Sequence, residues 1–307
     1  MSGDPPTRLD DAPLAPGLYL VATPIGNLGD ITLRALHVLK HVDRIACEDT
    51  RQTQKLLNHF QIATPTVSFH QHNERPRAAE LVDTLKAGGR IAVVSDAGMP
   101  GISDPGGWLV AMAIAAGVPV IPIPGANAAL SALIASGMPT GEFHFLGFLP
   151  EKAGARRTRL EALAQFASDS RETPATLIFY EAPHRILETL ADLESVWGPQ
   201  LRVVAARELT KIHEEFLRGD VNEVRRDLAA RDRIRGEFTL LVEAPAKALG
   251  APGLASATCE RLSDRLARLQ SEAGIDEKEA LKRLARESGK SKSELYRELQ
   301  RENARRR

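Results

Sequence analysis

Short apolar runs alternate with amphipathic stretches through the first half of the chain. Five short, mostly apolar runs predict strands: Leu18–Ala22, Arg44–Cys47, Thr66–Phe69, Arg90–Val94 and Val118–Ile123. Arg90–Val94 is rich in β-branched residues, which is typical of a strand buried on both faces of a sheet. The stretches between them repeat apolar residues at helical spacing and predict helices. Asp30 is a suitable cap for the first of these, and a later helix is predicted over Ala78–Ala87. Strands that alternate with helices predict a mostly parallel, open α/β sheet.

A second group of strands follows Phe143–Pro150, a stretch that we expect to close a first domain, 17–150. A second α/β domain with a mixed sheet is expected over 151–245, with strands at Thr176–Tyr180, Arg202–Ala206, His213–Leu217 and Glu237–Val242. A basic stretch lies at the junction of the two domains: Lys152, Arg156, Arg157 and Arg159.

The two ends of the chain differ in composition from the middle. Residues 1–16 are polar and proline-rich, which predicts a disordered leader, and 246–257 is a linker rich in Ala, Gly and Pro. In 258–307, helical stretches, a glycine break and a capping box predict a helix-turn-helix module. Its last part, Lys278–Arg307, holds eleven Lys or Arg against five Glu. This excess predicts either a surface for nucleic-acid phosphates or a salt-bridged hairpin that serves dimerisation.

The overall composition excludes several classes of protein. Acidic and basic residues number 40 each, which excludes a wholly basic nucleic-acid binder but not a local basic surface. Cys47 and Cys259 lack metal-ligand spacing, so we expect no metal and a reduced, cytoplasmic setting. Five prolines cut the uncharged stretch 105–141 into pieces too short to span a bilayer.

The loop 95–107, directly after the fourth predicted strand, has the most unusual composition. It holds four glycines and two prolines, and Asp96 and Asp104 put two acids at its rim. Open α/β sheets bind ligands at the carboxyl ends of their strands, and a loop of this length is more often functional than a plain turn. The rest of the chain is organised around a ligand site that we expect at this loop.

The loop after the first strand, 23–30, leaves other nucleotide enzymes open. It has Gly-x-x-Gly spacing, but neither the full dinucleotide fingerprint nor the lysine of a P-loop. Glu48 and Asp49 follow about twenty residues later, where a Rossmann unit holds a ribose. These residues alone permit a nicotinamide enzyme or an ordinary Rossmann-type adenosylmethionine enzyme. Both are disfavoured because the loop richest in glycine and proline follows the fourth strand, whereas in a Rossmann unit it follows the first.

Three stretches closely resemble one known family: Val21–Ile31, Ser95–Gly106 and Glu181–Arg185. Shorter matches at 48–51, 72–74 and 207–211 agree with them. These residues resemble the bacterial 16S ribosomal RNA ribose 2′-O-methyltransferases, which are members of the tetrapyrrole-methylase-like superfamily. The resemblance extends from about residue 17 to the C-terminus, and Met99 departs from it where the family usually has Thr.

The resemblance implies two α/β domains of class III methyltransferase type, with S-adenosylmethionine folded in the cleft between them. It implies nine cofactor-binding residues: Pro24, Val94, Ser95, Asp96, Met99, Asn127, Ala128, Glu181 and Leu209. The implied acceptor is a cytidine in the decoding centre of 16S ribosomal RNA, nucleotide 1402, on the RNA or on the small ribosomal subunit. A homodimer is expected as well.

The acceptor of such a reaction, a ribose 2′-hydroxyl, is a poor nucleophile that benefits from a base or a cation. Four candidate catalytic residues lie where predicted strands end: Asp49, Arg51, His72 and Lys211. We expect Asp49 or Lys211 to handle the hydroxyl proton, and Arg51 to grip an RNA phosphate with its planar fork. Asp49 has a second interpretation, as the cap of the helix that follows it.

Two other functions are compatible with parts of the sequence. A tetrapyrrole or other small-molecule methyltransferase of the same superfamily would share the cofactor site, but would need neither the basic module 258–307 nor the basic stretch 152–159. A non-catalytic RNA-binding module would explain the basic module, but not the glycine-rich loop.

Overall fold

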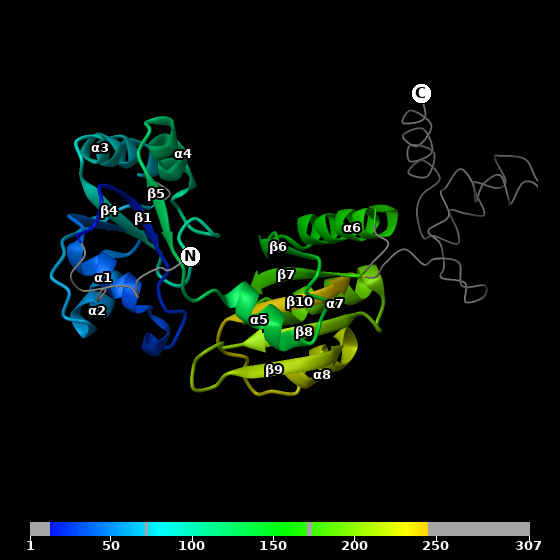
Figure 1. Cartoon of the computed structure of the whole chain (residues 1–307). Helices are drawn as coiled ribbons and strands as arrows, with labels where there is room; N and C mark the ends of the chain where they lie inside the picture. The colour runs from blue at the N-terminus through cyan, green and yellow to red at the C-terminus, as the bar shows by residue number, and fades with distance from the viewer. Residues whose placement is uncertain (1–12, 71–72, 171–173, 245–307) are drawn as a thin grey trace, which may run out of the picture. The chain divides into compact units, whose positions relative to one another are not determined.

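The computed structural model describes residues 13–70, 73–170 and 174–244, all of which belong to one compact unit, Met1–Lys247 (Figure 1). Three predictions fall mainly or wholly outside these residues: the leader 1–16, of which only 13–16 are described, the linker 246–257 and the module 258–307. No described helix combines the length and the apolar character that a membrane crossing requires.

The first sheet is parallel throughout, as the alternation of strands and helices predicts. Its strands are β1 (Gly17–Val21), β2 (Arg44–Cys47), β3 (Thr66–Ser68), β4 (Arg90–Val94) and β5 (Val120–Ile123). They are arranged in the order β3-β2-β4-β1-β5, so the strand that precedes the glycine-rich loop is central.

Helices cover both faces of this sheet (Figure 1). The helices are α1 (Leu33–His41), α2 (Thr50–His59), α3 (Glu74–Lys86) and α4 (Gly107–Ala115). Apolar residues of α1 and α2 pack on one face, with Leu39 and Leu57 completely buried. Those of α3 and α4 pack on the other, with Ala78 and Leu109 completely buried. Because both faces are covered, the strands can be apolar along their whole length.

Two predicted helix starts in this half are wrong. Asp30 does not cap α1, because it lies in a short 3-10 turn, Leu28–Asp30, and Thr32 Oγ1 accepts the capping bond from Ala35 N at 3.1 Å. Helix α3 starts at Glu74 and not at Ala78. Pro76 permits this earlier start, because the first turn of a helix leaves its N–H groups without intrahelical partners.

The second sheet is mixed. Its strands are β6 (Phe143–Phe148), β7 (Ala175–Glu181), β8 (Arg202–Arg207), β9 (Glu215–Asp220) and β10 (Phe238–Ala244). In the order β6-β7-β10-β8-β9, only the β6–β7 pair is parallel. Phe143–Pro150 therefore does not close the first half, since β6 pairs in the second sheet. The predicted strand His213–Leu217 starts two residues too early, because His213 and Glu214 lie in the turn before β9.

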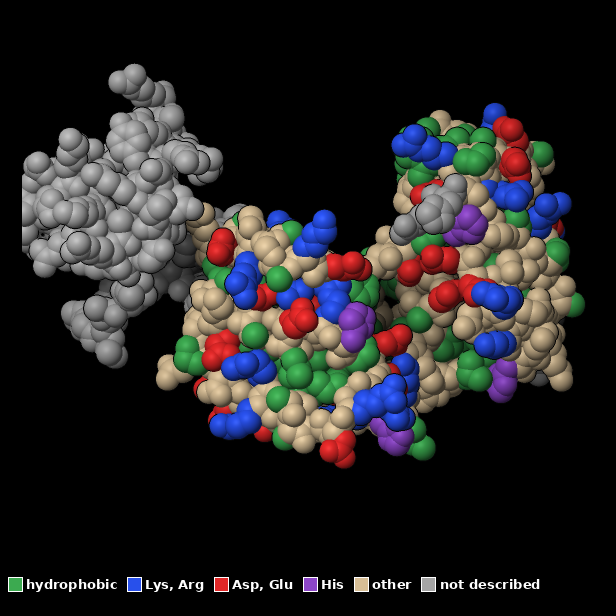
Figure 2. Space-filling view, turned by 180° about the vertical axis from the view of Figure 1, so that it is seen from behind, with side chains coloured by type: hydrophobic (Ala, Val, Ile, Leu, Met, Phe, Trp, Pro, Cys, Tyr) green, Lys and Arg blue, Asp and Glu red, His purple; other side chains and the backbone are tan. Residues whose placement is uncertain are grey.

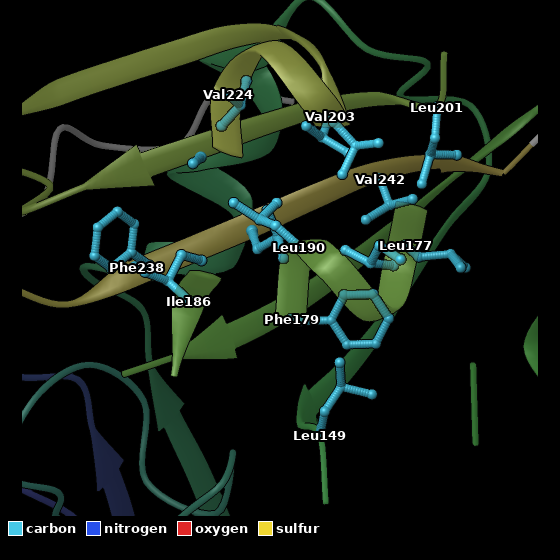
Figure 3. Packing of buried hydrophobic residues seen from close by; sticks show 14 of the residues in the cluster. Leu149, Leu177, Phe179, Ile186, Leu190, Leu201, Val203, Val224, Phe238 and Val242 are labelled. Atoms are coloured by element: carbon cyan, nitrogen blue, oxygen red, sulfur yellow. The ribbon is translucent and has the colours of Figure 1, made fainter. Parts of the chain in front are cut away.

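The second sheet is also covered on both faces. One face packs against α6 (Ala153–Ser170), α7 (Ile186–Trp197) and α8 (Val221–Ala229), through the core shown in Figure 3. The other face packs against α5 (Ala128–Ser136), which follows the last strand of the first sheet. Helix α5 thus joins the two sheets into one unit.

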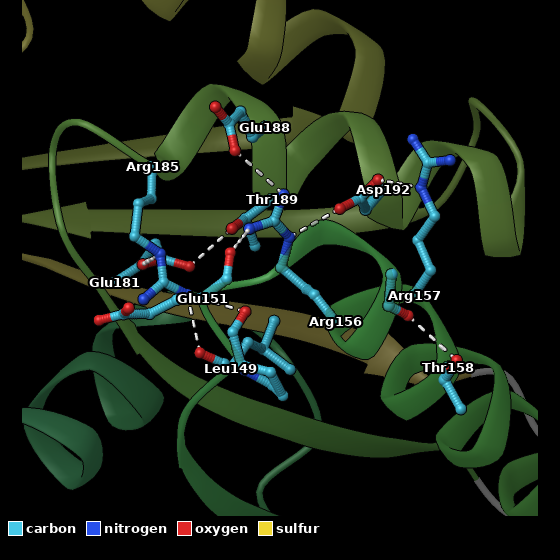
Figure 4. Close-up of polar contacts among 12 residues, drawn as sticks. Leu149, Glu151, Arg156, Arg157, Thr158, Glu181, Arg185, Glu188, Thr189 and Asp192 are labelled. Carbon is cyan, nitrogen blue, oxygen red and sulfur yellow. Dashed lines mark hydrogen bonds and ion pairs between the residues drawn. The ribbon is translucent and has the colours of Figure 1, made fainter.

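The basic stretch predicted at the domain junction is part of helix α6. Arg156 is completely buried, and its Nε lies 2.6 Å from Asp192 Oδ2 on α7 (Figure 4). Its Nη2 lies 3.2 Å from Glu188, and Arg157 Nε bonds the second oxygen of Asp192 at 2.5 Å. These two guanidinium groups therefore join α6 to α7, so Arg156 is not available to an RNA.

Candidate active site

A cavity of about 390 Å³ is lined by residues of both sheets. The loop after β4 and the turn before α5 contribute one side of its wall. The ends of β6, β7, β8 and β10, the loop after β8 and Ile25 contribute the rest. Its volume is in the range of sites for small molecules and cofactors. The predicted ligand loop therefore lines a cavity of suitable size.

The loops after β1 and β4 are fastened to each other by backbone bonds. Thr23 and Gly98 exchange N–H···O bonds of 2.9 and 3.1 Å. Thr23 Oγ1 donates to Ser95 O at 3.0 Å, and Ser95 Oγ donates to Gly98 O at 3.1 Å. Gly98 has φ +86°, a conformation that side chains rarely adopt. The chain itself thus preforms the start of the ligand loop.

Glu74 holds the other end of the same loop. Its Oε1 accepts from Gly106 N at 3.0 Å and from Trp108 N at 3.3 Å, where α4 begins without a side-chain cap of its own. A carboxylate at this position satisfies free N–H groups and opposes the positive end of the helix dipole. The sequence placed Glu74 in the 72–74 motif but did not indicate that it binds Gly106 and Trp108, more than thirty residues further along the chain.

The ligand loop carries two carboxylates into the cavity wall. Asp96 is exposed to the cavity, and Asp104 is half-buried. Burial raises the pKa of Asp104 to about 6, with further increases from the charges of Glu48 and Asp96 and an opposing hydrogen bond from Ser95. A cavity with this excess of acidic groups favours a cationic ligand.

Lys211 lies in the cavity wall, in the loop between β8 and β9. Its Nζ lies 2.7 Å from Glu208 Oε1 and 2.9 Å from Glu237 Oε2. Burial acts against the charged form, but hydrogen bonds to these two carboxylates raise the pKa of Lys211 above its ordinary value. Glu208 and Thr210 have φ of +51° and +66°, which is costly for residues with side chains. The loop thus holds a charged ammonium group at the cavity.

Glu181 and Asn127 support the backbone at the cavity wall. Glu181 is buried, and its oxygens accept from Ala182 N at 2.9 Å and from Thr189 Oγ1 at 2.6 Å. Asn127 Oδ1 accepts from Leu130 N at 2.9 Å and so caps α5. Both side chains fix the ends of the elements that meet there.

Six of the nine predicted cofactor residues line the cavity: Asp96, Met99, Asn127, Ala128, Glu181 and Leu209. Val94 and Ser95 are buried beneath the loop, and Pro24 precedes the lining residue Ile25. None of these three positions is part of the cavity lining.

The predicted catalytic residues are not gathered in one place. Lys211 lines the cavity, whereas Asp49 Oδ1 accepts from Arg51 N at 2.8 Å, so Asp49 does cap α2. Arg51 pairs with Asp49 at 3.0 Å and lines a separate shallow hollow on α2. Asp49 N donates to Asp96 Oδ1 at 3.3 Å, which connects the start of α2 to the cavity. His72 lies outside the described residues.

Sequence reasoning missed several further lining residues, among them Phe148, Tyr180 and Glu237. The first two belong to regular strands with no unusual composition. Within the described residues, no cluster of His, Cys, Asp and Glu has the arrangement of a metal site.

The sequence profile of the tetrapyrrole (corrin/porphyrin) methylases matches residues 17–225. The chain belongs to this family. Within the tetrapyrrole methylases, it is 56% identical over 226 residues to a protein of Halalkalibacterium halodurans named ribosomal RNA small subunit methyltransferase I, and the match covers 74% of this chain and 75% of that protein. A protein of Micromonospora olivasterospora with the same name is 49% identical over 267 residues, with 87% and 82% covered.

A solved structure shares the tetrapyrrole-methylase fold. The uroporphyrin III C-methyltransferase of Thermus thermophilus superposes with a TM-score of 0.51 at 17% identity, and the match covers 73% of this chain and 96% of that one. The described elements thus correspond to a known α/β architecture with two sheets.

Proposed function

We propose that this protein transfers a methyl group from S-adenosylmethionine to ribosomal RNA of the small subunit. The observation that carries the proposal is its identity of 56% and 49% to two proteins named ribosomal RNA small subunit methyltransferase I, over most of both chains. The cavity is consistent with the donor, because its preformed loop and acidic rim suit a small cationic ligand.

Asp96, Met99, Asn127, Ala128 and Leu209 would hold the cofactor, which supplies an activated methyl group on a sulfonium. Methyl transfer of this kind is an in-line displacement, so the main task of the protein is to position donor and acceptor. Good orientation supplies about 7–11 kcal/mol in well-aligned reactions. The bonds among Thr23, Ser95 and Gly98 serve this task by fixing the loop before any ligand arrives.

For the acceptor, we propose the 2′-hydroxyl of a cytidine in the decoding centre. Lys211 supports this choice, because an ammonium group at the cavity can stabilise negative charge that develops on a hydroxyl oxygen. On the face shown in Figure 2, acidic and basic side chains of the described residues are interspersed. On this face, RNA would therefore meet separate cations and not one continuous basic surface.

Mass mapping of methylated nucleotides in 16S RNA from cells with and without this protein tests the proposal. One 2′-O-methylcytidine should disappear when the protein is absent and return when it is supplied. Unchanged ribosomal RNA together with a loss of methylated tetrapyrroles would contradict the proposal, and would favour a small-molecule methyltransferase.

We also propose that the protein acts as a homodimer. Several apolar side chains of α4 and α5 are exposed, among them Ile114 (62%), Leu130 (47%) and Ile134 (80%). Leu130 and Ile134 lie four residues apart on α5 and so share one face of that helix, and an exposed apolar face is typical of a surface that contacts a partner. Light scattering should give twice the monomer mass, and Ile134→Glu should reduce it; a monomer at all concentrations would contradict this proposal.

For residues 258–307 we propose a role in RNA binding. Removal of this segment should leave cofactor affinity unchanged, and should weaken RNA binding and reduce its dependence on salt, because phosphate contacts release counterions. An unchanged salt dependence would instead assign the segment to dimerisation.

A further inference from the structure

We propose that Phe148 is a stacking platform for a planar nucleobase at the edge of the cavity. The inference rests on the proposed function only in naming the two ligands that carry such a base. These are the cofactor, through its adenine, and the RNA, through the base of the target nucleotide. Phe148 ends strand β6, lines the cavity and is 57% exposed, which is high for an aromatic ring next to a binding site.

A β-bulge turns Phe148 toward the cavity. Phe145 pairs with Ile178, but Gly147 pairs with the next residue, Phe179, so Leu146 is an extra residue in β6. Without the bulge, strict alternation would place Phe148 on the same face as Leu146, which packs against the core under α6, α7 and α8. With the bulge, Phe148 pairs with Tyr180 on the face that α5 covers. Bulges near sites commonly re-aim a side chain in this way.

The backbone of the bulge requires glycine. Gly147 has φ +64°, and a Cβ built on it would lie 3.4 Å from Ser103 Oγ of the ligand loop. The strand end therefore lies close to the loop that forms the opposite side of the cavity. A side chain at 147 would be strained, because its backbone has a positive φ that residues other than glycine rarely adopt.

Neighbouring rings fix the orientation of Phe148. Its ring meets that of Tyr180 edge-on, with centroids 5.8 Å apart and planes at 64°. Tyr180 is held in turn by an edge contact with Phe145 at 4.9 Å. Such a contact with Tyr180 can cover at most one face of the Phe148 ring. Stacking on a protein aromatic is the usual way to hold an unpaired base, and it tolerates any base.

Two binding measurements on the full-length protein test the platform and identify its ligand. Calorimetry with S-adenosylhomocysteine reports on adenine, and filter binding of unmethylated small ribosomal subunits, at saturating S-adenosylhomocysteine, reports on the RNA base. Phe148→Ala should weaken one of the two by roughly 5- to 150-fold, the range for loss of one stacked base. Phe148→Trp should stay within about threefold of the wild type, because it keeps a flat ring.

Two controls separate stacking from other effects. Phe148→Leu keeps an apolar side chain without a flat ring, and should be about as weak as Phe148→Ala. Phe143→Ala removes an exposed ring at the other end of β6, away from the cavity wall, and should change neither affinity. Thermal melting of each variant verifies folding.

The outcomes decide the inference in each case. Weaker S-adenosylhomocysteine binding identifies adenine as the stacked base, and weaker subunit binding identifies the target nucleotide. Unchanged affinities in Phe148→Ala, or wild-type affinity in Phe148→Leu, would overturn the platform. If the wild-type protein bound no subunits or RNA, the proposed function would fail, and the S-adenosylhomocysteine measurement alone would still decide the platform.

Discussion

The aliphatic stem of Lys211 lies where a side chain on Gly26 would have to be. A Cβ built on Gly26 would overlap Lys211 Cγ and come within 2.9 Å of its Cε. Gly26 belongs to the loop after β1 of the first sheet, and Lys211 to the loop after β8 of the second. The absence of a side chain at residue 26 thus creates the space through which Lys211 reaches the cavity.

We predict that Gly26→Ala lowers the rate of methylation roughly ten- to a hundredfold, since small displacements in an active site have effects of this size. The added methyl group would push Lys211 away from Glu208 and Glu237. Single-turnover methylation at saturating cofactor and RNA measures the effect. Gly154→Ala is the matched control, because a Cβ on Gly154 meets nothing within 4 Å. A normal rate in Gly26→Ala would show that the position of Lys211 is unimportant.

Lys211 should act as a cation and not as the base. Glu208 and Glu237 raise its pKa, so at neutral pH it holds its proton. Glu208→Gln should lower that pKa and move the alkaline fall in the methylation rate to lower pH. Lys211→Gln should lower the methylation rate roughly 10²-fold, as for loss of an oxyanion-stabilising donor. Lys211→Arg should retain more activity, because it keeps a positive charge.

The opposite result would identify Lys211 as the base. In that case Glu208→Gln would make the neutral amine more abundant, and the rate at neutral pH would rise. The pH profile must be compared with those of variants at the other acids of the cavity wall, Asp96, Asp104 and Glu181, and at Arg207, which faces Glu208.

The strands of the first sheet could be predicted from the sequence, but the pairing of β6 in the second sheet could not. Arg44–Cys47 and Arg90–Val94 match β2 and β4 residue for residue, because short apolar runs with clear ends specify buried parallel strands. Residues 143–148 carry the same kind of signal. Nothing in that segment states that it pairs with β7 of the other sheet, since pairing is a non-local property.

The candidate site shows the same limit. The unusual composition of its loop pointed to Asp96, whereas Met99 and Asn127 were implied by the resemblance to a known family. Phe148 and Tyr180 lie in ordinary strands, where the pattern gives the buried face but not what lies opposite it. Helix α6 was missed because Arg156, which lies on its buried side, is polar and so does not contribute to a pattern of hydrophobic positions. Its ion pair with Asp192 is what allows this arginine to be buried.

The buried pair of Arg156 and Asp192 should matter for stability and not for RNA binding. Their side chains are 2% and 3% exposed. Arg156→Met should lower the free energy of unfolding by about 3–5 kcal/mol, because it leaves a buried carboxylate without its main partner. Urea denaturation measures this change. Arg157→Met should cost about 1 kcal/mol or less, because the Arg157 side chain is 58% exposed.

A double variant tests the cause of that loss. Arg156→Met combined with Asp192→Leu should recover much of the lost stability, since apolar pairs often replace buried ion pairs without cost. If Arg156→Met instead weakened RNA binding and left the free energy of unfolding unchanged, the basic stretch would be an RNA contact after all.

Asp104 should make cofactor binding depend on pH and on the charge of the ligand. Burial and the charges of Glu48 and Asp96 raise the pKa of Asp104 to about 6, so at about pH 5 the free protein holds a proton there. A sulfonium bound in this cavity favours the ionised carboxylate, so binding should release that proton. Affinity for S-adenosylmethionine should therefore rise between about pH 5 and pH 7 and then level off.

S-adenosylhomocysteine is the control ligand, because it lacks the transferable methyl group and its sulfur is therefore uncharged, while the rest of the molecule is the same. Its affinity should change much less over this range, and Asp104→Asn should make the two ligands behave alike. Calorimetry in buffers of different ionisation enthalpy counts the protons released at each pH. Equal pH dependence for both ligands in the wild type would mean that the positive sulfur lies too far from Asp104 to affect its ionisation. In that case Asp96 would be the nearer carboxylate, and Asp96→Asn, not Asp104→Asn, should reduce the preference for the charged ligand.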